Sequence, residues 1–330
     1  MAGAAARPTP WQDPERVLLG VNLWSMHTTW ADLLAAAVRA DELGYDTLST
    51  SDHVLACVGE QGPVFEGYLS LAAWAQATSR VRLGLLATAN TFREPTLLAK
   101  MITTLDHISG GRAFLGIGAG WFEEEHTGYG FEFGAGPGER LRWLGEALPL
   151  LRSMLGGDPA AAAVGRYRPA AARNDPGPIQ ERIPIIVAGD GERVTLRLVA
   201  TYGDACNFGF HHGADALARK ERILREHCVE VGRDESQIAR TTEIRVVIIR
   251  DTRREADRAY AELRKLNGDA PFWPAQPVGT PDDVSEKLEP LVALGFRHII
   301  CGFPHPHDAE SMVRLRREVL PRLQAVAGGG

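Results

Sequence analysis

The sequence contains few cysteines and no long apolar run, and each absence excludes a class of protein. Its four cysteines are far apart and include no CxxC pair; they are Cys57, Cys206, Cys228 and Cys301. This spacing does not predict a disulfide framework or a zinc site, and it indicates free thiols in a reducing compartment. No apolar stretch reaches the length of about 18 residues that a membrane-spanning helix needs.

The chain also carries fewer positive than negative side chains. The chain carries 36 Lys and Arg against 42 Asp and Glu, a formal net charge of −6. A protein that binds the phosphate backbone of nucleic acids is expected to be basic, so this balance argues against such a partner. The amino terminus has no apolar signal segment, and we therefore predict a cytoplasmic protein. Residues 1–14 and 327–330 are expected to be flexible tails.

What the sequence does contain is a regular alternation of β-rich and helical segments. The predicted strands are 16–24, 47–53, 81–89, 113–120, 183–191, 204–208, 242–250 and 298–303. The predicted helices are 30–44, 67–79, 95–109, 139–155, 192–203, 216–232, 253–267, 281–294 and 308–326. Strands that are nearly all followed by helices predict a parallel α/β sheet, and eight such units favour a closed (β/α)8 TIM barrel over an open sheet.

One segment interrupts this alternation. Residues 156–181 are rich in Ala, Gly, Pro and Arg and lack periodicity. We predict that they form an insertion before the fifth strand, close to the mouth of the active site. No boundary divides the chain, so a single domain is expected over residues 15–326.

The active site of a TIM barrel lies at the carboxyl ends of its strands, so the polar and aromatic residues there are the candidates. They are Trp24, Asp52, His53, Thr88, Asn90, Gly118, Gly120, Trp121, Asn207 and Phe208. Asp52 and His53 are suited to acid/base chemistry or to orienting a ligand. A purely structural histidine is an equal alternative.

Two further patterns concern ligands. Gly189, Asp190 and Gly191 lie between a predicted strand and a helix, where backbone N–H groups can hold a phosphate, although a turn without a ligand is equally common. The histidine pairs 211–212 and 305/307 resemble metal ligands at first sight. A zinc or iron site needs further convergent ligands, which the sequence does not indicate, so no metal is predicted.

Four segments of the chain resemble the bacterial luciferase-like superfamily, and within it the F420-dependent oxidoreductases. They are residues 40–54, 81–133, 183–208 and 278–304, with the motifs SDH, LLATAN, GIGAGW and VAGDGE. The resemblance extends over nearly the whole chain from about residue 16. It implies a TIM barrel that binds the deazaflavin coenzyme F420, with FMN as the alternative, and that pairs as a homodimer through its early helices.

The resemblance also implies residue roles. Asp52 and His53 would lie beside the deazaflavin ring, with His53 as a proton donor or a shield of the ring. A non-prolyl cis peptide bond is expected near Leu86–Ala87, behind the ring. Thr88 and Asn90 match positions that contact the polar edge of the ring, and Gly118 and Gly120 leave room for it. The turn at 189–191 matches the phosphate-binding turn.

The chain departs from some relatives at Trp121, because sugar-phosphate dehydrogenases of this branch have an acidic Glu there. No cluster of Lys or Arg suited to a substrate phosphate is evident either. We therefore expect a small, uncharged or aromatic substrate in a pocket formed by Trp24, Phe65, Trp121, Asn207 and Phe208. The predicted reaction is hydride transfer with F420, reducing an activated C=C or C=N bond. An FMN-dependent monooxygenase, a non-catalytic flavin-binding barrel and a metal-dependent hydrolase are the alternatives.

Overall fold

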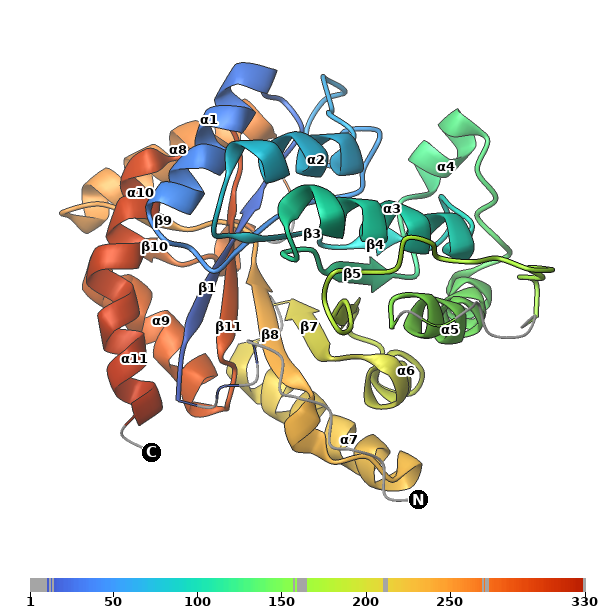
Figure 1. Ribbon diagram of the computed structural model, residues 1–330. Coiled ribbons are helices and arrows are strands. Elements are labelled where there is room, and N and C mark those ends of the chain that lie inside the picture. Colours follow the sequence, from blue (N-terminus) through green and yellow to red (C-terminus); the bar gives the residue numbers. More distant parts are fainter. Residues whose placement is uncertain are drawn as a thin grey trace.

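Parallel strands form a barrel surrounded by helices in the computed structural model (Figure 1). The structure describes residues 11, 13, 15–156, 158, 165–209, 213–268, 270 and 273–328. The main sheet has the order β3-β2-β1-β11-β8-β7-β6-β5-β4. Its strands are β1 (Leu18–Leu23), β2 (Thr47–Thr50), β3 (Arg82–Leu85), β4 (Thr88–Ala89), β5 (Leu115–Gly118), β6 (Ile185–Ala188), β7 (Ala205–Gly209), β8 (Ala239–Ile244) and β11 (His298–Phe303).

Two pairings close the barrel. β1 pairs in parallel with β11 over six residues, from Leu18 to Leu23, so the first and last strands of the chain are neighbours. β3 and β4 are two halves of the predicted strand 81–89, and the peptide bond Leu86–Ala87 between them is cis. β3 pairs with β2, and β4 pairs with β5. The nine strands therefore fill eight positions, and the predicted (β/α)8 barrel is confirmed.

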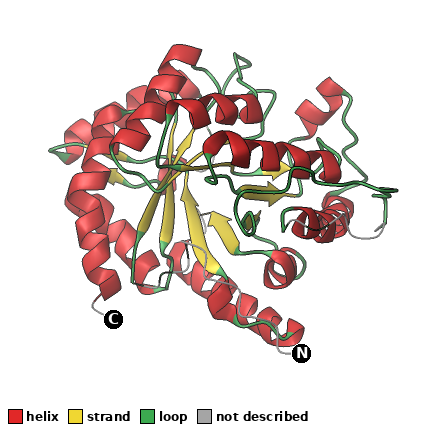
Figure 2. Cartoon of the chain, in the orientation of Figure 1, coloured by secondary structure: helices red, strands yellow, loops and turns green. Residues whose placement is uncertain are grey.

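Helices cover the outside of the barrel (Figure 2). In α3 (Pro95–Ser109), Leu98, Ala99, Ile102 and Leu105 follow helical spacing and are buried against the strands. Pro95 begins this helix and Gly110, with φ at 68°, ends it, as the sequence predicted. The other long helices are α1 (Trp30–Glu42), α2 (Gly67–Ala77), α5 (Pro137–Met154), α6 (Thr195–Tyr202), α7 (Gly213–Val231), α8 (Arg253–Asn267), α9 (Pro281–Ala293) and α11 (Leu320–Gly328).

Several elements differ from the prediction. A short helix that was not expected, α4 (Glu123–Tyr129), follows β5 and begins with three glutamates, which suit the positive end of a helix. The predicted strand 242–250 divides into β8 and β9 (Ile248–Ile249), and β9 pairs with β10 (Val278–Gly279) in a separate small sheet. The last predicted helix contains α10 (Ala309–Arg314), a π-helical segment (Leu315–Val319) and α11.

The insertion predicted near the active site takes a different course where it is described. Asn174 donates to Thr103 Oγ1 and to the Met154 carbonyl oxygen, which attaches it to α3 and α5. Gln180 donates to Asp106 and to the Ala113 carbonyl oxygen, below the start of β5. Residues 165–181 thus start beside Asn90, whose Nδ2 donates to the Tyr167 hydroxyl at the carboxyl end of the third predicted strand, and run along the outside of the barrel toward its amino-terminal end. Residues 157 and 159–164 lie outside the described residues.

Trp11 lies inside the segment that was expected to be a flexible tail, yet it is buried. Its ring meets that of Phe114 edge to face, with centroids 5.3 Å apart, and lies 6.0 Å from the ring of His298 at the start of β11. It therefore covers the amino-terminal end of the barrel, opposite the predicted active site. At the other terminus α11 continues to Gly328, and residues 1–10 and 329–330 lie outside the described residues. Among the described residues, no helix is long and apolar enough to cross a membrane.

Candidate active site

A cavity opens at the carboxyl ends of the strands, where the sequence placed the active site. Its volume is about 340 Å³. The ends of β2, β4, β5, β6, β7 and β8 all contribute to its wall. We call it the glycine-lined cavity, and the predicted site residues that line it are Asp52, His53, Leu86, Ala87, Thr88, Gly118, Gly120, Trp121, Gly189, Asp190 and Asn207.

A second cavity, also of about 340 Å³, adjoins the first. The two share Ser51, His53, Trp121 and Arg245 in their walls. The remaining wall of the second cavity is mostly apolar, and we call it the apolar cavity; it is formed by Asn22, Trp24, Met26, Cys57, Val58 and Ala270. The site is therefore a double chamber in which His53 faces both halves.

Asp52, at the end of β2, is a buried anchor. Its Oδ2 accepts hydrogen bonds from the Ala89 N–H at 2.9 Å and from Arg93 Nη1 at 2.7 Å, and its Oδ1 accepts from Arg93 Nη2 at 3.0 Å. Burial raises the pKa of Asp52, and the Arg93 guanidinium partly opposes that rise. Arg93 also pairs with Glu66 at 3.0 Å and lies over the Tyr68 ring. These contacts indicate that Asp52 holds β2, β4 and the start of α3 together.

His53 is held by an acidic residue that sequence reasoning missed. Its Nδ1 lies 3.1 Å from both carboxylate oxygens of Glu125, on α4, and Glu125 also accepts from the Val54 N–H. The ring of His53 meets those of Trp121 and Phe122 edge to face. Burial disfavours its charged form, but the Cys57 and Glu125 side chains outweigh burial and raise the pKa of His53 to about 10. His53 is therefore an imidazolium near neutral pH, with a donor on each ring nitrogen.

Glycine gives the first cavity its flat wall. A Cβ atom on Gly118 would lie 3.4 Å from the Ala188 carbonyl oxygen and 3.9 Å from the Ala87 Cβ, so its absence leaves room inside the cavity. Gly189 has a φ of 133°, a backbone conformation that residues other than glycine rarely adopt. The Ser51 hydroxyl is buried without a hydrogen-bond partner among the described residues. The wall thus offers a flat backbone surface and an unsatisfied hydroxyl to a ligand.

The predicted contacts of the third strand are met only in part. Thr88 lines the cavity, and its hydroxyl lies 2.6 Å from that of Tyr68. Asn90 does not line either cavity, because its Nδ2 donates to the Tyr167 hydroxyl at 3.1 Å, outside the barrel mouth. Gly191 also lies off the cavity and packs on Thr195 at the start of α6. Neither residue is placed to contact a ligand in this cavity.

Two aromatic residues predicted for the substrate pocket belong to the core instead. Phe208 follows Asn207 on β7, and neighbouring residues of a strand point to opposite sides. Asn207 therefore lines the cavity, whereas Phe208 is fully buried against Phe296. The Phe65 ring packs on that of Trp30, with centroids 5.7 Å apart. Trp24 and Trp121 line the apolar cavity, and their role in a substrate pocket stays a prediction.

Of the histidines considered as metal ligands, His307 has other partners, whereas His305 Nδ1 is buried without a hydrogen-bond partner among the described residues. His307 is buried, with Nδ1 2.9 Å from the Phe303 carbonyl oxygen and Nε2 3.2 Å from Thr28 Oγ1. Among the described residues, no group of three His, Cys, Asp or Glu is placed to hold a metal ion. His211 and His212 lie outside the described residues.

The model of the luciferase-like monooxygenase family matches residues 10–277 of this chain. The chain therefore belongs to that family, which confirms the resemblance inferred from its motifs.

Two relatives and two solved structures are similar to this chain over most of its length. F420-dependent glucose-6-phosphate dehydrogenases of Microbacterium testaceum and Amycolatopsis mediterranei are 28% and 25% identical; each alignment covers 89% of this chain, and 93% and 95% of the relatives. An F420-dependent secondary alcohol dehydrogenase solved with an F420-acetone adduct has a TM-score of 0.79 at 18% identity, covering 93% of this chain and 99% of that one. The FMN complex of a 3,6-diketocamphane monooxygenase of Pseudomonas putida has a TM-score of 0.71 at 22% identity, with 93% and 98% covered. These solved structures share the fold.

Replacement of Arg93 by Met is expected to destabilise the protein strongly. It leaves the Asp52 carboxylate buried without its cation, a defect that costs about 3–5 kcal/mol in other proteins. The free energy of unfolding, measured in urea, checks this. The double variant Asp52→Asn/Arg93→Met is expected to lose less than Arg93→Met alone. Arg142→Met, which removes the pairs of an exposed arginine with Glu139 and Glu146, serves as the control and should cost about 1 kcal/mol or less. An equally small loss for Arg93→Met would contradict the anchoring role.

The pairing of His53 with Glu125 predicts a specific pH dependence. Because the folded-state pKa of His53, about 10, lies above the ordinary 6.5, its contribution to stability is full below about pH 6.5 and is lost as the pH rises to about 10. The unfolding free energy of the wild type minus that of His53→Gln should decline over this range. In Glu125→Gln the pKa of His53, followed by NMR of the imidazole C–H signals, should fall. Glu124→Gln, an exposed neighbour on α4, should leave it unchanged. An unchanged pKa in Glu125→Gln argues against the pairing.

Proposed function

We propose that this protein is an F420-dependent oxidoreductase that transfers a hydride between coenzyme F420 and a small organic substrate. The observation that carries the proposal is the double chamber, in which a flat glycine-lined wall adjoins an apolar cavity with a cationic His53 between them. F420-dependent names among the relatives, over nearly their full length, support the choice of coenzyme.

The residues present fit a flat deazaflavin ring. Gly118 and Gly189 leave space for the ring, and Ala87 and Thr88 lie in the same wall. The Ser51 hydroxyl, which has no hydrogen-bond partner among the described residues, could form a hydrogen bond with it. The bound coenzyme would supply or accept the hydride. His53, held by Glu125, would provide the proton that accompanies hydride addition to a C=C or C=N bond. Asp52 and Arg93 fix the strand end from which His53 projects.

The substrate would occupy the apolar cavity. Trp24, Met26 and Val58 offer it apolar surface, and the exposed ring of Trp121 lies at the junction with the first cavity. An aromatic or alkyl body suits this lining better than the hydroxyl-rich ring of a sugar phosphate. Reduction of an activated double bond is therefore favoured over oxidation of a sugar phosphate.

An FMN-dependent monooxygenase is the second candidate. It is favoured by the similarity in fold to the diketocamphane monooxygenase, which was solved with FMN. The same glycine-lined wall would accept either ring system, so the two candidates differ in the coenzyme that binds.

Titration of the purified protein with F420 and, separately, with FMN tests the proposal, with ligand fluorescence as the readout. We expect micromolar affinity for F420 and much weaker binding of FMN. Gly118→Val fills the cavity and should weaken F420 binding at least about tenfold, or 1.4 kcal/mol. Gly138→Val adds the same side chain where a Cβ meets no neighbour, and should bind F420 normally. Tight FMN binding without F420 binding would favour the monooxygenase, and binding of neither would overturn both.

We also propose that the protein forms a homodimer and that it is cytoplasmic. Leu69 on α2 and Leu97 on α3 are 75% and 55% exposed, and these two helices pack side by side. Such residues suit a subunit interface. Four free cysteines suit a reducing compartment.

The oligomeric state tests the interface. Light scattering is expected to give the mass of a dimer, and Leu69→Lys should shift the equilibrium toward the monomer because it places a charge in the apolar contact. Val229→Lys, on the 82% exposed Val229 of α7, is the matched control and should stay dimeric. A monomeric wild type would contradict the proposed interface.

A further inference from the structure

Arg245 is the cation that sequence analysis overlooked, because it is a single residue and not part of a basic cluster. It follows β8 and lies in the wall of both cavities. Its side chain is 43% exposed, and its Nη1 lies 3.3 Å from Glu243 Oε1. Among the described residues, that is its one ion pair. A guanidinium has five N–H donors, so most of its donors are open to a ligand.

The surroundings of Arg245 favour a ligand with negative charge. Among the described residues, no acidic side chain lines the apolar cavity. Four carboxylates line the adjoining glycine-lined cavity, and each has a partner. Asp52 binds Arg93, Glu125 binds His53, and Asp190 accepts from the Gly209 N–H. Glu243 accepts from Asn22 Nδ2 at 3.1 Å as well as from Arg245. The charged groups in the described wall of this cavity are thus the cations His53 and Arg245, next to the polar side chains of Asn22 and Ser51, and this combination suits an anion with an apolar body.

The backbone that carries Arg245 is fixed on both sides. On one side it packs on β11, where a Cβ on Gly302 would lie 2.1 Å from the Arg245 carbonyl oxygen, so only glycine allows this contact. The next residue, Val246, donates to the side chain of Gln276. These contacts hold the start of the β8–β9 connection.

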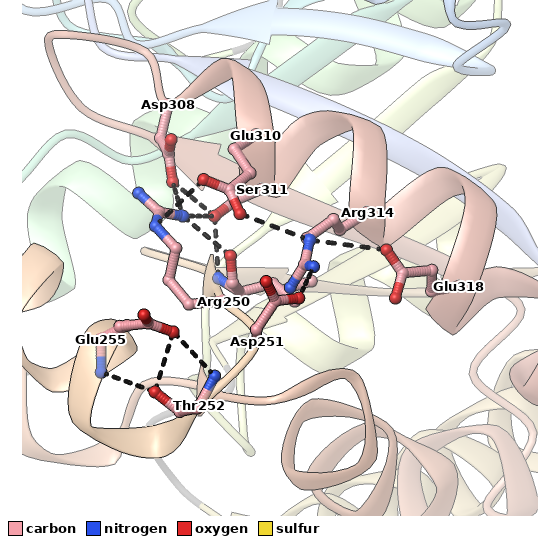
Figure 3. Close-up of polar contacts among 10 residues, drawn as sticks. Arg250, Asp251, Thr252, Glu255, Asp308, Glu310, Ser311, Arg314 and Glu318 are labelled. Atoms are coloured by element: carbon pink, nitrogen blue, oxygen red, sulfur yellow. Dashed lines mark hydrogen bonds and ion pairs between the residues drawn. The ribbon is translucent and has the colours of Figure 1, made fainter.

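Beyond it, β9 is held by the polar network drawn in Figure 3. There Arg250 pairs with Asp308 at 2.8 Å. The Ile249 N–H also donates to Ser311 Oγ. The guanidinium of Arg245 is thus presented from a connection that is anchored at both ends, as a recognition residue requires.

We propose that Arg245 binds a carboxylate at one end of the substrate, whose apolar remainder occupies the cavity formed by Trp24, Met26 and Val58. This proposal rests on the proposed function for its meaning, since the ligand it describes is the substrate of that reaction, and Arg245 and His53 both lie in the wall that the two cavities share. It replaces the expectation of an uncharged substrate with an apolar carboxylic acid. A carboxylate suits the planar guanidinium, which can hold both oxygens at once.

Binding of a matched pair of probes tests the proposal. The probes are 3-phenylpropionate and 3-phenylpropionamide, which share shape but differ in charge. Isothermal titration calorimetry is performed with the protein alone and with the protein saturated with oxidised F420, so no turnover occurs. We expect the wild type to bind the carboxylate at least about tenfold more tightly than the amide. Arg245→Met should abolish that preference with little change for the amide, and Arg245→Lys should retain part of it.

Two further variants sharpen the test. Glu243→Gln removes the counter-charge of Arg245 and should tighten carboxylate binding without changing amide binding. Arg222→Met, on the exposed surface of α7, should leave the preference intact. A preference that persists in Arg245→Met, or is absent from the wild type, overturns the proposal. Arg245-dependent binding of glucose 6-phosphate that is tighter than that of phenylpropionate overturns the assignment of an apolar body.

The coenzyme is the other possible source of a carboxylate or phosphate, and F420 affinity distinguishes the two. If Arg245→Met weakens F420 binding tenfold and leaves the probe preference unchanged, the residue serves the coenzyme and the proposal fails. If the wild type does not bind F420, the proposed function fails, while the probe preference of the protein alone still decides the role of Arg245.

Discussion

The parallel pairing of the first strand with the last is the constraint on which the rest of the molecule depends. Because β1 and β11 pair along their full lengths, the sheet curves into a barrel and the carboxyl ends of all its strands meet at one rim. His53 and Arg245 are 192 positions apart in the sequence, yet they line the same two cavities for this reason. Trp11 covers part of the opposite end of the barrel, where its ring packs on that of Phe114.

Two buried charged side chains at that rim, Asp52 and His53, each have a partner of opposite charge. Asp52 is balanced by Arg93, and His53 is balanced by Glu125, each at hydrogen-bond distance. Charges this buried would be costly if they were single, and each pair also fixes the position of a loop. Asp52 attaches β2 to β4 and α3, whereas Glu125 attaches β2 to α4. The partial pairing of Arg245 stands out against these complete pairs.

The sequence was sufficient for the barrel and for most of the cavity wall, because both follow from local patterns. The alternation of strands and helices, the proline and glycine that bound α3, and the polar strand ends are all local. The errors arise where position along a strand decides which way a side chain points. Phe208 faces the core because Asn207 faces the cavity, and strand 204–208 was too short for its register to be read from the pattern. Arg93 and Glu125 were missed because only the fold brings them to Asp52 and His53.

The junction between the two cavities explains why a histidine and an arginine suit this site better than two acids would. In the proposed reaction a hydride and a proton would reach neighbouring atoms of a double bond, so the substrate would have to be held in one orientation relative to the ring. Apolar walls alone bind without direction, because burial of apolar surface does not depend on orientation. A cation at one point of the wall would supply direction by holding one end of the substrate. Trp121 adds no charge to this junction, where Glu125 and Glu243 are already paired with His53 and Arg245.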